Sequence, residues 1–215
     1  MKRRYMMKRL TTSVGLVLIL VVIGSPIVAA QERMTVDVSA AFGPHNSSPE
    51  TTPIAQQWTT AIGTAQKSIR VTLYSFTLFA FRDALIQAKG NHPDLDIRVV
   101  FDQGILNQAG EAENLRLLSC AGIPLKVYVS SSLMHHKFVL IDADDPTLQP
   151  TLITGSANKT VAAVRNNHDN QTLLTWVSGS RALFDWFRDE FEAMWANVFD
   201  YPAGSSFNDW VAPFC

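Results

Sequence analysis

The sequence predicts an α/β protein whose mixed, largely parallel β-sheet is flanked by helices on both faces. Segments 68–76 and 96–101 are rich in β-branched and aromatic residues, as in strands, and a segment with helical character lies between them. Two strands joined through a helix are expected to pair in parallel, because the crossover returns the chain to the same edge of the sheet. The chain has 215 residues, 47% of them hydrophobic, which is enough for one well-filled domain.

Residues 1–30 have the composition of a secretory signal peptide. Basic residues come first, an apolar run from Val14 to Ile23 follows, and small residues end the segment at Ala30. The run is shorter than the roughly 20 residues of a membrane-spanning helix, which favours cleavage after Ala30 over an uncleaved anchor. The prediction is a periplasmic or secreted protein with a globular domain over 31–199 and a tail over 200–215.

Cleavage would change the charge of the chain. It leaves 13 Lys and Arg against 19 Asp and Glu, a net charge of about −6. Since nonspecific nucleic-acid binders usually present a basic face, composition weighs mildly against a polyanionic substrate, although a local basic groove stays compatible with it. The two cysteines, Cys120 and Cys215, lie in a compartment that permits disulfides, and pairing within the chain, pairing between chains and free thiols all stay open.

The first predicted elements are a strand and a helix. Apolar and polar residues loosely alternate over 35–42, and the turn-rich stretch 43–49 follows. Pro53 after Thr52 is typical of a helix start, and apolar residues then recur at helical spacing as far as Ala65. This helix is expected to bury one stripe.

The next elements form the expected crossover. A helix from Leu78 to Lys89, ended by Gly90, joins the strand over 68–76 to the strand over 96–101. Asp102 opens a loop at the carboxyl end of the second strand, where open α/β sheets place their ligand sites.

The second half continues with further helices and strands. A helix over 180–198 carries one apolar face and is expected to be core. The other predicted elements are a helix over 111–121 and strands over 124–129, 137–142, 151–154 and 171–177.

Two polar groups of the strand over 137–142 carry the chemistry. Side chains two apart in a strand share a face, so His135 and Lys137 are expected to point the same way. An imidazole can attack or protonate a phosphate ester, while an ammonium and an amide hold the nonbridging oxygens. Asn158, just after the next predicted strand, supplies the amide.

The pattern His-x-Lys-x4-Asp followed by Gly-Ser-x-Asn resembles the phospholipase D superfamily. The matching positions are His135, Lys137, Asp142, Gly155, Ser156 and Asn158. Over about 36–195 the chain is similar to the small bacterial single-motif (HKD) members, which act as secreted nucleases, although the loop between Asp142 and Gly155 is about twice the usual length. The resemblance implies a phospholipase D-like fold and makes 31–199 the catalytic domain.

The resemblance also implies a two-step displacement at phosphorus. One His135 attacks the phosphodiester to give a phosphohistidine, a second histidine protonates the leaving alcohol, and water attacks in the second step. The chain has one copy of the motif and the mechanism needs two, so a symmetric homodimer with both His135 side chains at the twofold axis is implied. No cofactor is implied.

The other motif residues have implied roles as well. Lys137, Ser156 and Asn158 would bind phosphoryl oxygens, and Asp142 organises the motif and the interface more than it reacts. Asp169 stands where the family more often has Glu, and would fix the tautomer of the imidazole. The predicted catalytic residues are His135, Lys137, Asp142, Asn158 and Asp169.

A metal site is the rival interpretation of the same side chains. It would draw on His135, His136, His168, Asp142 and Asp169. Adjacent residues of a strand point to opposite faces, so His135 and His136 do not readily share one ion, and no metal is expected.

The leading prediction is thus an exported, metal-independent phosphodiesterase, an endonuclease that acts on DNA or RNA without strong sequence preference. The first alternative is a phospholipase D-type hydrolase or transferase acting on phospholipid head groups, favoured by the acidic charge and the aromatic tail. The second is an inactive dimeric phosphate-binding module, disabled by the shorter side chain of Asp169.

Overall fold

The computed structural model describes residues 33–197, and the predicted signal segment 1–30 and tail 200–215 lie outside this range. The strands are β1 (Met34–Phe42), β2 (Ser68–Leu73), β3 (Asp96–Asp102), β4 (Leu125–Tyr128), β5 (Val139–Ile141), β6 (Thr151–Gly155) and β7 (Asn170–Gly179). The α-helices are α1 (Pro53–Ile62), α2 (Phe79–Asn91), α3 (Ala109–Cys120), α4 (Val161–Arg165) and α5 (Ala182–Asn197), and short 3-10 helices lie at Pro49–Thr51 and Gln103–Asn107.

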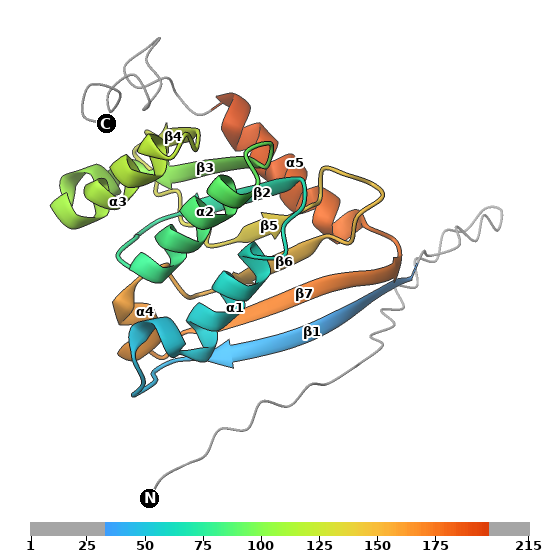
Figure 1. Cartoon of the computed structure of the whole chain (residues 1–215), viewed down its shortest axis with the longest axis horizontal. Coiled ribbons are helices and arrows are strands. Elements are labelled where there is room, and N and C mark those ends of the chain that lie inside the picture. The colour runs from blue at the N-terminus through green and yellow to red at the C-terminus, as the bar shows by residue number, and fades with distance from the viewer. Residues whose placement is uncertain (1–32, 198–215) are drawn as a thin grey trace, which may run out of the picture.

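The described strands form a seven-stranded open sheet in the order β1-β7-β6-β5-β2-β3-β4, with helices on both faces (Figure 1). The predicted fold class, a mixed α/β sheet between helices, is confirmed. The expected excess of parallel pairs is wrong, because only β2/β3 and β3/β4 are parallel and the other four pairings are antiparallel. Helices α2 and α3 connect the strands that are parallel neighbours, whereas β5 returns directly to β6 through a loop and pairs with it in antiparallel orientation.

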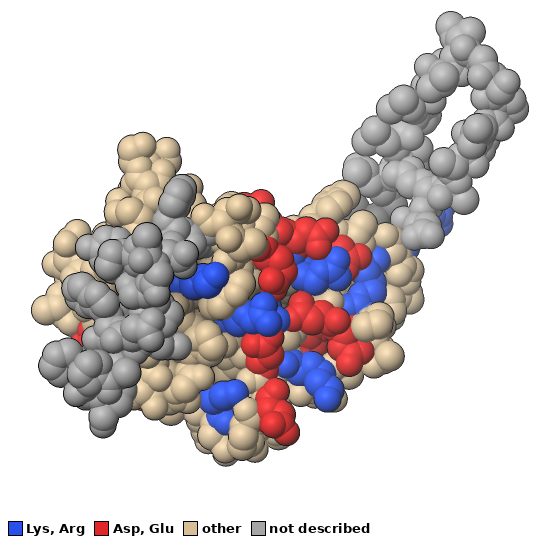
Figure 2. All heavy atoms as spheres, turned by 90° about the horizontal axis from the view of Figure 1, so that it is seen from above, with Lys and Arg blue, Asp and Glu red and all other residues tan. Residues whose placement is uncertain are grey.

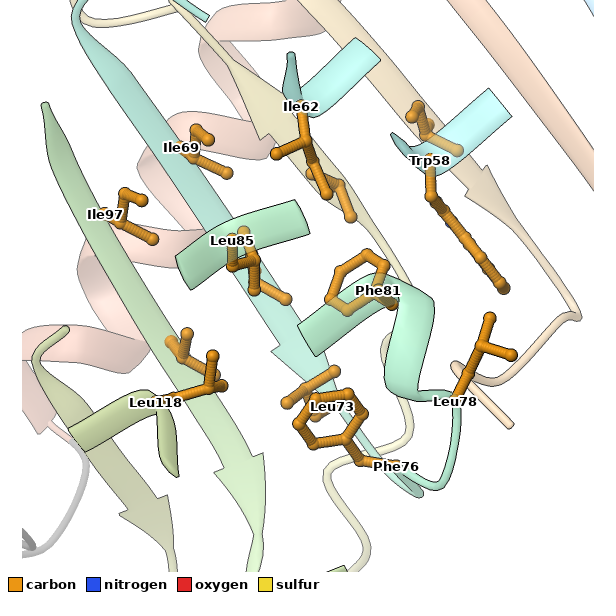
Figure 3. Packing of buried hydrophobic residues seen from close by; sticks show 14 of the residues in the cluster. Trp58, Ile62, Ile69, Leu73, Phe76, Leu78, Phe81, Leu85, Ile97 and Leu118 are labelled. Carbon is orange, nitrogen blue, oxygen red and sulfur yellow. The ribbon is translucent and has the colours of Figure 1, made fainter. Parts of the chain in front are cut away.

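One face of the sheet is covered by α1, α2 and α3 (Figure 3). Thr52 caps α1 by accepting a hydrogen bond from the Ala55 amide, and the apolar stripe behind it buries Trp58 against the sheet. The Trp58 ring meets Phe81 of α2 edge to face, with ring centroids 5.6 Å apart. These contacts fix the two helices beside the strand ends where the predicted site residues lie.

The opposite face packs against α5. Along β5 the side chains alternate, so that Val139 and Ile141 join the core under α1 and α2 while Leu140 joins the core under α5. Phe184 and Phe191 of α5 are fully buried there, as its apolar face predicted.

A buried guanidinium ties α5 to the sheet. Arg70 of β2 is 3% exposed and pairs with Asp96 at 2.7 Å, with Glu192 of α5 at 3.3 Å, and with Asp144. Arg98 of β3 shares Asp96 and Glu192, so the charges form one network. Figure 2, seen from above relative to Figure 1, shows Lys and Arg interleaved with Asp and Glu on the uncovered part of this side.

Three differences from the predicted elements follow from local chemistry. Gly90 lies inside α2 and does not end it. The short helix α4 was not predicted; Thr160 caps it through the Ala163 amide. The strands expected over 68–76 and 137–142 are shorter. At the end of the first and the start of the second, backbone amides bond to side chains, those of Glu111 and Thr72, and not to a neighbouring strand.

The described cysteine is Cys120, at the end of α3, and it is disulfide-bonded. Cys215, the other cysteine of the sequence, lies outside the described residues. Within residues 33–197, no helix combines the length and apolar composition needed to cross a membrane.

Candidate active site

The segment that carries His135 and Lys137 is clamped at both ends. Upstream, the Met134 amide donates to the buried carboxylate of Asp102 at 2.9 Å. Downstream, the Phe138 amide donates to the Thr72 hydroxyl at 2.9 Å, and the Phe138 carbonyl accepts from the Thr72 amide at 3.1 Å. The segment therefore keeps a fixed extended shape at the edge of the sheet although it belongs to no strand.

His135 and Lys137 meet on the ring of Tyr74, the residue that follows β2. The imidazole of His135 lies edge to face with the Tyr74 ring, with centroids 4.4 Å apart. The ammonium of Lys137 lies 5.0 Å from the centroid of the same ring and donates to the His135 carbonyl at 2.9 Å. The two side chains thus lie on the same side, as alternation along an extended segment predicted.

His136 points the other way. Its Nε2 lies 3.3 Å from Glu190 of α5, and its ring packs edge to face with Phe138 at 5.9 Å. The structure therefore places His136 against α5, away from Tyr74.

The second part of the motif turns tightly at the end of β6. A Cβ at Gly155 would collide with the carbonyl of Asn170, so only glycine fits there. The next residue, Ser156, donates its hydroxyl to Asp169 Oδ1 at 2.6 Å and accepts from the Asn170 amide at 3.0 Å. Ser156 and Asp169 thus form a pair at this edge.

Asp169 also lies close enough to influence Lys137. Partial burial lowers the pKa of the Lys137 ammonium, and the negative charge of Asp169 opposes that shift. The predicted hydrogen bond from His135 to Asp169 is absent: in the described part of the chain, the imidazole has no hydrogen-bond partner and its residue is exposed. The Asp169 carboxylate instead accepts the hydroxyl of Ser156, which lies at the end of β6.

Asn158 has its amide oxygen buried without a hydrogen-bond partner among residues 33–197. Since Oδ1 faces inward, Nδ2 is the atom left to donate toward a phosphoryl oxygen.

Asp142, which the sequence analysis includes among the catalytic residues, does not lie with these side chains. It lies beyond the far end of β5, where its buried carboxylate accepts the amides of Gln66 (3.0 Å), Lys67 (2.7 Å) and Ser68 (3.0 Å). Its backbone has a positive φ of 55°, which brings the carboxylate under the turn between α1 and β2. Asp142 acts as an organiser that locks this turn to β5.

The side chains of the rival metal site are dispersed as well. Asp142 lies at the opposite end of β5 from His135, and His136 faces α5. Across residues 33–197, no group of three or more His, Cys, Asp or Glu side chains is arranged to hold a metal ion.

Lys159, which the sequence analysis did not single out, is 1% exposed, and its Nζ has no hydrogen-bond partner within residues 33–197. That atom lies 5.5 Å from the centroid of the Trp58 ring. Burial lowers the pKa of the Lys159 ammonium to about 7, and repulsion from Lys137 is the second cause. The sequence signal for Lys159 is its place directly after Asn158 of the motif.

The chain is similar to known proteins over most of the described residues. The family described as "Cardiolipin synthase, PLD-like domain" matches residues 59–195. Mitochondrial cardiolipin hydrolase of Xenopus tropicalis is 27% identical over 61% of this chain, and that of Homo sapiens is 31% identical over 63%. The chain spans about half the length of these curated relatives, 56% and 48% respectively.

Solved structures share the fold. Nuc from Salmonella typhimurium, described as a phospholipase D family member, is 26% identical, with a TM-score of 0.64 over 77% of this chain and 98% of that one. NucT from Helicobacter pylori aligns with a TM-score of 0.60 over 75% of this chain and 96% of that one, and its 15% identity supports the fold alone.

The position of Asp142 predicts a structural role that can be measured. Asp142→Asn keeps the size of the side chain and tolerates the left-handed backbone, but it replaces an acceptor oxygen with a donor facing three amides. We expect the free energy of unfolding to fall by about 2–4 kcal/mol, while turnover per folded molecule is unchanged. Asp83→Asn, at a carboxylate 60% exposed, is the control and should change little. Full stability combined with lost turnover in Asp142→Asn would contradict this role.

The buried amine of Lys159 predicts a pH dependence of stability. Its folded-state pKa of about 7 lies below its ordinary value of 10.5, so the unfolded chain binds more protons between these values. The free energy of unfolding should therefore rise with pH in this window by about 1.4 kcal/mol per pH unit from this group. Below pH 7 the amine is protonated in both the folded and the unfolded chain, so its destabilising effect is complete there.

Denaturation from pH 7 to 9.5 measures this slope. Lys159→Met removes the amine and keeps an unbranched chain, so it should be more stable than wild type at pH 7 and lack the added slope. Lys67→Met, at an exposed lysine, should run parallel to wild type. Parallel curves for Lys159→Met and wild type would show that the amine is not buried in solution.

Proposed function

Because this chain belongs to the phospholipase D-like family, we propose that it is a phosphodiesterase that cleaves nucleic acid through a phosphohistidine formed on His135. One observation carries the proposal: the His135 imidazole is exposed and free of hydrogen bonds in the described chain, and the Lys137 ammonium lies on the same aromatic ring. An unbonded imidazole beside a fixed cation suits attack on a phosphate ester.

The proposed reaction has two balanced steps. A ring nitrogen of His135 forms a bond to phosphorus as the bond to the leaving oxygen breaks, and a second imidazole gives that oxygen its proton. Water then attacks phosphorus, returns a proton to the second imidazole, and releases His135. Lys137 offsets the charge on the phosphoryl oxygens, and Asn158 Nδ2 donates to them.

A symmetric homodimer would supply the second imidazole. The sequence has a single His-x-Lys pair, and His136 is turned toward Glu190. Two copies that meet at this edge of the sheet would bring one His135 from each chain to a shared phosphorus.

Nucleic acid is the proposed substrate because Nuc aligns along nearly its whole length with this chain. The small single-motif members, which the sequence resembles, act on nucleic acid in secreted form. The predicted signal segment 1–30 fits that setting, and we propose export to the periplasm or beyond.

Phospholipid is the second candidate, favoured by the exposed apolar side chains at this edge. Leu133 is 61% exposed and precedes His135 by two residues, and Phe79 is 57% exposed beside the Thr77–Val161 contact. Phe42 ends β1 next to Asn170 and is exposed as well. Such side chains can enter an acyl layer, and the curated relatives are named cardiolipin hydrolases.

A cleavage assay separates these functions. The purified protein is incubated in excess chelator with plasmid DNA and, separately, with phosphatidylcholine or cardiolipin vesicles. We expect plasmid cleavage, and His135→Asn should reduce it by about 10³-fold or more, since it removes the nucleophile. His168→Asn, at an exposed histidine outside the motif, is the matched control and should retain activity.

The other results of this assay each contradict the first candidate. Intact plasmid beside cleaved lipid would establish the phospholipid enzyme. No turnover of either substrate, together with binding of inorganic phosphate, would leave the inactive phosphate-binding module.

A further inference from the structure

The orientation of His135 has no carboxylate to account for it. Asp169, expected to accept from the far ring nitrogen, binds Ser156, and no other described side chain forms a hydrogen bond with the imidazole. Yet a nucleophilic imidazole must be held at a defined angle to phosphorus, because misplacement costs rate steeply. Some other contact must therefore set the ring.

We infer that Tyr74 is the positioning residue of this site, an aromatic platform that orients the His135 imidazole and the Lys137 ammonium together. This inference rests on the proposed function for its effect on turnover. The centroid separation of 4.4 Å at an interplanar angle of 70° is a close edge-to-face contact, which has a preferred geometry. The Lys137 ammonium, 5.0 Å from the centroid, adds a cation–π contact to the same ring.

The platform itself is held rigidly. Immediately after Tyr74, the Ser75 hydroxyl and the Phe76 amide both donate to the carboxylate of Glu111 in α3, at 2.8 and 2.7 Å. Asn114, one turn along α3, donates to the Phe76 carbonyl at 3.0 Å. The backbone of Tyr74 is thus fixed on both sides, by β2 before it and by residues 75–76, which are hydrogen-bonded to α3, after it. This fixes the position from which the ring projects.

The ring, and not the hydroxyl, makes these contacts. Among residues 33–197 the Tyr74 hydroxyl forms no hydrogen bond, whereas the ring contacts both motif residues. Tyr74→Phe should therefore preserve the platform, and Tyr74→Leu should remove it with a similar apolar volume. If the Tyr74 ring served only to fill space, its replacement by leucine would affect His135 and Lys137 no more than other residues around it.

The test compares three variants by steady-state kinetics and by NMR of the histidine ring protons, with the His135 signals assigned from His135→Asn. An aromatic ring shifts the resonances of protons beside it, so the His135 signals report the contact directly, whether or not the protein turns over substrate. Phe76→Leu, at a buried aromatic residue two positions away, is the control for lost core packing.

We expect Tyr74→Phe to keep kcat within about twofold and to keep the shifted His135 resonances. Tyr74→Leu should lower kcat by roughly tenfold to hundredfold, more than it raises KM, and move those resonances toward the values of an exposed histidine. Phe76→Leu should lose stability while turnover per folded molecule and the His135 resonances stay the same.

The inference is overturned if Tyr74→Leu leaves the His135 resonances unchanged, or if kcat per folded molecule falls equally in Tyr74→Leu and Phe76→Leu. If the wild-type protein cleaves no phosphodiester, the proposed function fails, and the resonances alone decide whether Tyr74 orients the imidazole.

Discussion

The site depends on a short extended segment that no strand ladder holds. The Asp102 carboxylate accepts the amide of Met134, and Thr72 forms hydrogen bonds with the amide and the carbonyl of Phe138. These two clamps hold residues 135–137 from both ends. Successive side chains of this segment point to opposite sides, and this alternation determines what each of them contacts. His135 and Lys137 face Tyr74, whereas His136 faces α5. Both clamps come from β2 and β3, two neighbouring parallel strands inside the sheet, so interior strands fix the geometry of the exposed imidazole.

The charges behind the site are unusual for a protein core. Lys159 is fully buried beside Trp58 and pairs with no carboxylate among residues 33–197, and its ammonium is disfavoured by burial and by Lys137. A phosphate bound at Lys137 would offset part of this repulsion, so anion binding and protonation of Lys159 should favour each other. The core thus accepts a desolvated amine at a place where the proposed substrate brings negative charge.

Much of the fold was predictable because its signals are local. The Pro53 start of α1, the β-branched run of β3 and the apolar face of α5 all depend on residues close in sequence. The motif spacing likewise predicted that His135 and Lys137 share a side. Predictions failed where distant residues decide the outcome. Asp102 reaches Met134 across 32 positions, and Asp142 reaches the turn before β2 across more than 70.

Two further features of the site had no usable local signal. A lysine is usually a surface residue, and only the structure, in which Lys159 lies beside Trp58 of α1, shows that this one is buried. Similarly, Tyr74 was part of an expected strand, yet its importance lies in a ring contact with a residue 61 positions later, which periodicity does not encode.

The central claim is that His135 forms the covalent intermediate. Rapid acid-free quenching during turnover, followed by mass spectrometry of the peptide that contains residues 135–137, tests it most directly. The account predicts a phosphoryl adduct on His135 that disappears when substrate is exhausted. Turnover with no adduct on this peptide, or with the adduct on another residue, would contradict it.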